Sequence, residues 1–94
     1  MSSRRGGSRE RVDRDPWLRA VGLAIREYRN ALGVSQEELG YRAGLHRTYV
    51  SSVEMGRRNL SIQNIHRIAS ALGVSMTELI QLCEDRLDRP TATP

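Results

Sequence analysis

Residues 36–55, QEELGYRAGLHRTYVSSVEM, constrain the fold more than any other part of the chain. Apolar residues recur at helical spacing on both sides of Gly44, where a first helix can end in the left-handed conformation that glycine adopts most easily. Gly40 leaves room where the two helices would cross. The residues expected to hold the helices together are Leu39, Ala43, Leu45, Val50 and Val53. This spacing predicts a helix-turn-helix whose second helix, about residues 46–54, lies in the major groove of DNA.

The outward face of this second helix carries short polar side chains and one arginine. The residues predicted to contact DNA from it are Arg47, Thr48, Ser51 and Ser52. We expect Arg47 to read a base, because a bidentate arginine–guanine contact is the commonest specific one; a phosphate-bound or solvated arginine is the alternative. Thr48 can offer its methyl group to thymine or its hydroxyl to a base or a phosphate; for Thr48 the alternative is helix capping. Ser51 and Ser52 alternatively serve only to let the helix approach closely.

The chain around this motif also shows helical periodicity. Asp15 before Pro16 is a typical helix start, and Gly33 is a typical helix end. Ser35 with Glu38 and Ser75 with Glu78 have the spacing of capping boxes. Apolar faces are expected from Leu18, Val21, Ile25, Tyr28 and Leu32 in the first helix, and from Ile62, Ile65, Ile68, Ala69 and Leu72 in the fourth, which Ser61 caps. We therefore predict an all-α fold, a compact five-helix domain over residues 15–88.

The two ends of the chain have compositions unlike the middle. Residues 1–14 are rich in Arg, Gly and Ser and offer almost nothing to bury, so we predict a disordered Arg-rich arm. Such an arm is either a solvated tail or a segment that reaches DNA. Residues 89–94 are predicted to be a polar C-terminal tail.

Charge and composition narrow the class of protein. The chain has fifteen basic residues, all of them arginine, and eleven acidic residues, which gives a formal net charge of +4. This favours a polyanionic partner such as nucleic acid, although a GC-rich coding sequence explains an all-arginine composition equally well. The apolar runs are too short to span a membrane. A single cysteine excludes an intramolecular disulfide and fits a cytoplasmic protein.

No set of residues has the spacing of an active site or a metal site. His46 and His66 lie twenty positions apart, without cysteine or carboxylate at ligand spacing. Cys83 has no histidine near it in the sequence. We therefore expect no catalytic residue, no metal and no cofactor, and we predict that the protein is not an enzyme.

The stretch from Leu23 to Ile80 closely resembles the lambda-repressor-like, or Cro/repressor-type (XRE), helix-turn-helix family. The matching segments are IREYRNALGVSQEELGYRAGLHRTYVSSVE, GRRNLS and IASALGVSMTEL. Within that family, the segments AGLHRTYVSSVE and GRRNLS resemble those of the controller proteins of restriction–modification systems. A phage-type repressor and an antitoxin-like regulator are the other subclasses considered. The resemblance implies a transcriptional regulator that binds double-stranded operator DNA, usually as a dimer.

The resemblance also assigns roles to residues outside the outward face. It implies that Gln36 grips a phosphate and braces the head of the recognition helix. The residues that it places against the DNA backbone are Arg57, Arg58 and Asn59. Arg29 and Glu54 match a family ion pair. Met55 departs from the charged or polar residue that relatives usually carry before the glycine of this turn.

An apolar stripe on the last helix predicts assembly. Met76, Ile80, Cys83 and Leu87 follow one another at spacings of four, three and four, and they add more apolar surface than a monomer of this size needs. We predict a homodimer joined through this stripe. The alternative function is a protein-interaction helix-turn-helix, antitoxin-like or polymerase-associated, but the outward arginines argue against it. RNA polymerase is a further candidate partner of a DNA-bound regulator.

Overall fold

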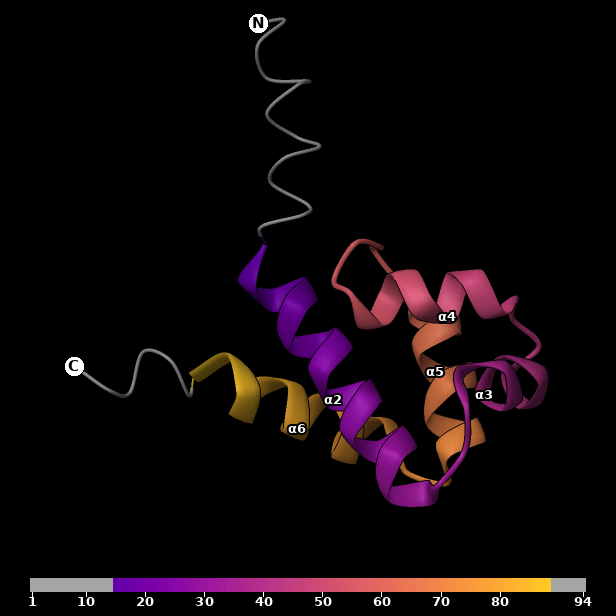
Figure 1. The fold of residues 1–94 in the computed structure, drawn as a ribbon. Coiled ribbons are helices and arrows are strands. Elements are labelled where there is room, and N and C mark those ends of the chain that lie inside the picture. Colours follow the sequence, from indigo (N-terminus) through magenta and orange to yellow (C-terminus); the bar gives the residue numbers. More distant parts are fainter. Residues whose placement is uncertain (1–14, 89–94) are drawn as a thin grey trace, which may run out of the picture.

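In the computed structural model, residues 15–88 are described, and they form five helices (Figure 1). In chain order these are α2 (Pro16–Leu32), α3 (Gln36–Ala43), α4 (Arg47–Glu54), α5 (Ile62–Leu72) and α6 (Met76–Asp88). No strand occurs among these residues, so the predicted all-α fold with five helices is confirmed. The predicted arm, residues 1–14, and tail, residues 89–94, lie outside the described residues.

The helices are arranged around α2. The last helix, α6, crosses α2 on one side, while α3, α4 and α5 gather on the other side (Figure 1). Apolar residues from all five helices meet between them. The fully buried side chains of this core include Ile25, Leu39, Val50, Val53, Ile68, Leu79 and Cys83. The two halves of the helix-turn-helix are therefore fixed to the same core as the first and last helices.

Local capping explains most of the helix boundaries. The carboxylate of Asp15 accepts a hydrogen bond from the backbone N–H of Trp17 at 2.8 Å and so caps α2. Ser75 and Glu78 exchange both bonds of a capping box at the start of α6, as predicted. At the start of α3 only one of the two hydrogen bonds of the predicted capping box forms. Ser35 accepts from the N–H of Glu38, but the Glu38 carboxylate pairs with the guanidinium of Arg42, one turn further on.

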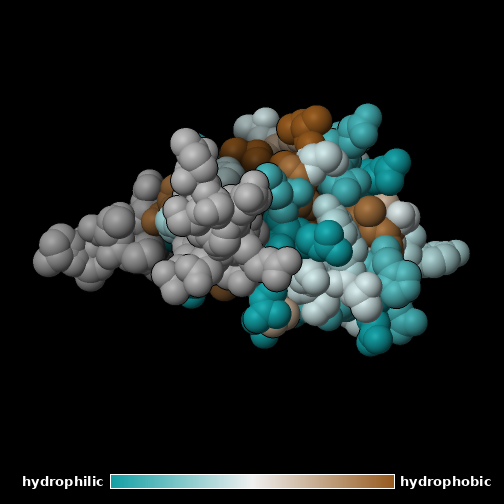
Figure 2. Space-filling model, turned by 90° about the horizontal axis from the view of Figure 1, so that it is seen from above, coloured by the Kyte–Doolittle hydropathy of each residue, from teal (hydrophilic) through white to brown (hydrophobic). Residues whose placement is uncertain are grey.

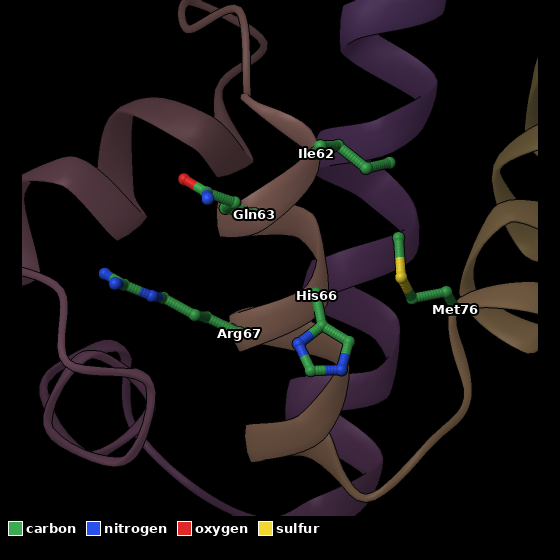
Figure 3. Close-up of a pocket in the computed structure, with 5 residues that line it drawn as sticks. All are labelled: Ile62, Gln63, His66, Arg67 and Met76. Atoms are coloured by element: carbon green, nitrogen blue, oxygen red, sulfur yellow. The ribbon is translucent and has the colours of Figure 1, made fainter.

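Two residues expected in the core lie on the surface instead. Leu32 is 45% exposed and Ile62 is 66% exposed. Both continue the apolar period of their helix, but Leu32 is the last residue of α2 and Ile62 the first of α5. At these ends the neighbouring helices no longer cover the apolar face. Ile62 lines a shallow surface depression with His66 and Met76, where the start of α5 faces the start of α6 (Figure 3).

Candidate nucleic-acid interface

The angle between α3 and α4 depends on two glycines. Gly44 ends α3 with φ of 73°, a left-handed conformation that favours glycine. Gly40 lies against the linker: a β-carbon there would come within 2.6 Å of the carbonyl oxygen of Leu45. The N–H of Leu45 in turn donates to the carbonyl of Gly40 at 2.8 Å. The tight turn therefore holds α4 in a fixed direction relative to α3.

The polar face of α4 points away from the core. Arg47 and Thr48 are exposed, and Ser51 and Ser52 are half-buried. Within residues 15–88 no side-chain hydrogen bond holds Arg47, Ser51 or Ser52. Figure 2 views the molecule from above in the orientation of Figure 1, the side on which α4 lies, and hydrophilic and neutral residues cover much of it. The donors and acceptors predicted to contact DNA are thus presented to solvent.

The first turn of α4 is capped by a histidine. Nδ1 of His46 accepts a hydrogen bond from the backbone N–H of Thr48 at 3.2 Å. The same nitrogen lies 2.9 Å from the hydroxyl oxygen of Thr48. The capping role considered for Thr48 therefore belongs to His46, and α4 begins at Arg47.

The turn after α4 carries three exposed polar residues, Arg57, Arg58 and Asn59. The guanidinium of Arg58 lies over the ring of Tyr49, 5.3 Å from its centroid. The hydroxyl of Tyr49 accepts from the side-chain amide of Asn64 at 3.0 Å. This chain of contacts ties Arg58 to α4 and α5 while its charge remains at the surface.

The last residue of α4 is a buried carboxylate. Glu54 is 8% exposed, and its oxygens accept from Nε and Nη2 of Arg29 at 2.6 and 3.0 Å. A third bond comes from the side-chain amide of Gln36 at 3.0 Å. Arg29 also donates to the carbonyl of Val34 at 2.9 Å. The hydrogen bond with Glu54 raises the pKa of Arg29, so its guanidinium stays charged. The structure thus brings the predicted partners Arg29 and Glu54 together.

Comparison with known proteins identifies the family. A family model described as helix-turn-helix matches residues 25–79, which is more than half of the chain. The chain belongs to the XRE-type helix-turn-helix family. The predicted family resemblance is therefore confirmed.

The relatives of this helix-turn-helix protein include several controller proteins. Control protein C.BamHI from Bacillus amyloliquefaciens is 43% identical over 60 residues, 63% of this chain and 74% of the relative. The restriction–modification controller protein C.AhdI from Aeromonas hydrophila is 47% identical with a TM-score of 0.65, over 66% of this chain and 94% of that chain.

A structure of the controller protein C.Esp1396I was solved as a tetramer with its natural 35 base-pair operator. It is 32% identical with a TM-score of 0.71, over 76% of this chain and 93% of that chain. The predicted class, a DNA-binding transcriptional regulator, is confirmed by this family membership.

The hydrogen bonds of Gln36 and of His46 are among the contacts of this helix-turn-helix protein that were not predicted from its sequence. Gln36 was expected to bind a phosphate and to brace the head of the recognition helix, but one of its amide hydrogens is directed to Glu54, the last residue of α4. The brace is therefore at the opposite end of α4, and the second amide hydrogen remains for a phosphate. The residue type of His46 did not indicate a cap, because capping is expected from Ser, Thr, Asp or Asn. The position of His46 directly before Arg47, at the predicted helix start, is the one indication that the sequence offers.

One residue of the predicted dimer stripe is wrongly placed. Cys83 is fully buried in the core of the protomer, and burial raises the pKa of its thiol to about 11. Because its side chain belongs to the core that α6 shares with α2 and α5, Cys83 offers no surface to a partner. Met76, Ile80 and Leu87 are half-buried, so the stripe without Cys83 stays a prediction.

The described part of this helix-turn-helix protein contains no cluster of three or more His, Cys, Asp or Glu that could hold a metal ion. Within the same residues, no helix is long and apolar enough to cross a membrane.

Proposed function

We propose that the outer face of α4 reads operator DNA in the major groove and that the protein regulates transcription in this way. The observation that carries the proposal is the division of polar groups on α4. Its inner end is fixed by three hydrogen bonds to Glu54, whereas Arg47, Ser51 and Ser52 face solvent without a side-chain partner in residues 15–88. A rigid helix with unpaired outward donors and acceptors suits recognition of base edges.

The contacts fall into two kinds. Base contacts come from Arg47 and Thr48, and contacts to bases, sugars or phosphates come from Ser51 and Ser52. Backbone contacts come from the start of α3 and from the turn that follows α4: Gln36, Arg57, Arg58 and Asn59. Phosphate contacts fix register and orientation, while the base contacts supply the sequence preference.

A binding experiment tests this proposal. The protein is titrated with its own upstream DNA and with a random duplex of equal length, at several salt concentrations. Tighter binding to the upstream DNA, with affinity that falls as salt rises, supports the proposal. Equal affinity for both duplexes, or no binding, contradicts a sequence-specific regulator of its own operon.

We further propose that the protein acts as a homodimer joined through Met76, Ile80 and Leu87 of α6. One such domain reads only a few base pairs, so useful specificity requires two half-sites about one helical turn apart. A two-fold interface would cover apolar side chains that remain half-buried in the protomer. The operator complex of the similar C.Esp1396I contains a tetramer, which agrees with assembly on DNA.

Substitution in the middle of this stripe tests the interface. Ile80→Asp places a carboxylate in an apolar contact, where its desolvation is costly, so we expect a folded monomer with weakened operator binding. Sedimentation at micromolar concentration, with circular dichroism as the folding control, measures this. A wild-type monomer on a two-site operator, or an intact Ile80→Asp dimer, would place the interface elsewhere.

The proposed role is that of a cytoplasmic, controller-like regulator without enzymatic activity or a cofactor. Its partners are double-stranded operator DNA and a second copy of the chain, with RNA polymerase as a candidate for the DNA-bound dimer. The similarity to C.BamHI and C.AhdI supports this subclass.

A further inference from the structure

The head of the recognition helix contains an unusual hydrogen-bond arrangement. His46, the N-cap of α4, directs Nδ1 at both polar groups of Thr48, its backbone N–H at 3.2 Å and its hydroxyl oxygen at 2.9 Å. Both residues are exposed, and they flank Arg47. The cap is thus part of the surface proposed to contact DNA.

The backbone bond determines which ring nitrogen carries the proton. A backbone N–H can only donate, so Nδ1 must accept from it, and the proton of the neutral ring is then on Nε2. An unprotonated Nδ1 at 2.9 Å from the Thr48 oxygen is favourable only if the hydroxyl hydrogen lies between the two atoms, because otherwise two lone pairs would face each other. The hydroxyl of Thr48 therefore donates to His46 and shares the single lone pair of Nδ1 with the backbone N–H.

This arrangement decides what Thr48 can offer to DNA. Its hydroxyl hydrogen is engaged with His46, so the outward side of the oxygen presents lone pairs alone. In the major groove such an acceptor matches the amino group of adenine or cytosine, and it opposes the carbonyl oxygens of guanine and thymine. A threonine without this partner could turn its hydroxyl to serve as donor or acceptor.

We propose that His46 is a positioning residue for base readout: by capping α4 through Nδ1, it makes the Thr48 hydroxyl an acceptor that selects adenine or cytosine. This inference rests on the proposed placement of α4 in the major groove. It adds a specificity role for His46 and assigns a direction to the hydrogen bond that Thr48 makes.

The test is selection from a library of duplexes with randomised sequence, followed by competition titrations with single-base variants of the selected site. Wild type is expected to select adenine or cytosine at one position of each half-site. Thr48→Val keeps the shape of the side chain but removes the hydroxyl, and should lower that preference about fivefold, the value of one ordinary hydrogen bond. Preference at the other positions should remain.

Substitutions at His46 separate positioning from capping. His46→Ala frees the Thr48 hydroxyl and should weaken the preference at the same position, while His46→Asn supplies a capping oxygen that accepts from both groups and should restore it. Ser61→Ala is the matched control, because Ser61 caps α5 in the same way, through the N–H of Asn64 at 3.1 Å. It should lower the unfolding midpoint without changing any base preference.

Several outcomes would overturn the inference. These are an unchanged preference in His46→Ala, the same loss in Ser61→Ala, or a Thr48-dependent position that selects guanine or thymine on the contacted strand. A Thr48→Val protein with wild-type preference at every position overturns it as well. If the wild type enriches no sequence at all, the proposed DNA readout itself fails, which is a different result.

Discussion

The two sides of α4 use polar residues in opposite ways. At its inner end, Glu54 is nearly buried and its oxygens receive three hydrogen bonds from Arg29 and Gln36. On its outer side, Arg47, Ser51 and Ser52 have no side-chain hydrogen bond within residues 15–88. Both kinds of residue occur within one helix of eight residues. A polar side chain whose hydrogen-bond partners all lie inside the protein stabilises the fold. A polar side chain without such partners is available to bind a ligand.

The inner side holds α4 to two other helices. Arg29 belongs to α2 and Gln36 to α3, so Glu54 joins three helices at one point. Close backbone contact accompanies this: a β-carbon on Gly22 of α2 would come within 2.5 Å of the carbonyl oxygen of Val53. The position of the outer face relative to α3 therefore depends on the inner side, although neither Glu54 nor Arg29 needs to touch DNA.

The largest expected effect is loss of the inner carboxylate. Glu54→Ala leaves the guanidinium of Arg29 partly buried without its partner, which should lower the free energy of unfolding by about 3–5 kcal/mol. A denaturant titration of Glu54→Ala, Arg29→Ala and the double variant measures the coupling. Additive effects would show that the pair contributes nothing as a pair.

A matched control comes from an ion pair at the surface. Glu38 and Arg42 on α3 form an exposed pair at 2.9 Å, four residues apart in one helix. Removing Glu38 should change the free energy of unfolding by only about 0.3–0.5 kcal/mol. A loss as large as that of Glu54→Ala would mean that burial does not distinguish the two pairs.

The next effect concerns the outer side. Arg47→Ala removes an exposed side chain, so stability should hardly change, whereas binding to the operator should weaken by roughly 1–3 kcal/mol per half-site. Preference should relax at one base pair. Competition titrations with operator and random DNA measure this; equal losses for both DNAs would make Arg47 a phosphate contact.

Helix boundaries and the outward residues were predictable from the sequence, and several side-chain contacts were not. Periodicity and glycine positions define α3 and α4 because they are local properties. The bond from Gln36 to Glu54 depends on an approach of residues eighteen positions apart, which periodicity does not report. Cys83 was misplaced because the spacing along α6 fits two adjoining faces, and only packing against α2 and α5 selects which face is buried.

The smallest expected effect on affinity comes from the turn beyond α4, where Arg58 combines an internal contact with an outward charge. Arg58→Ala should weaken binding to all DNA sequences alike. Removal of one phosphate contact should make the slope of log affinity against log salt shallower by about 0.9, because one fewer counterion equivalent is released. The base preference should stay unchanged.

Arg67→Ala is the control for Arg58→Ala, because it removes the same charge from the α5 surface, where Arg67 lines the depression with His66 and Met76 (Figure 3). Its slope should match the wild type. Fluorescence titrations at four or more salt concentrations give the three slopes. If the slope of log affinity against log salt in Arg58→Ala equals that of the wild type, Arg58 does not contact DNA. Its role would then be the contact with the ring of Tyr49, and Arg58 would belong with Glu54 among the residues that hold α4 in place. A shallower slope without loss of base preference would place Arg58 on the DNA backbone, next to a helix whose own outer residues do the reading.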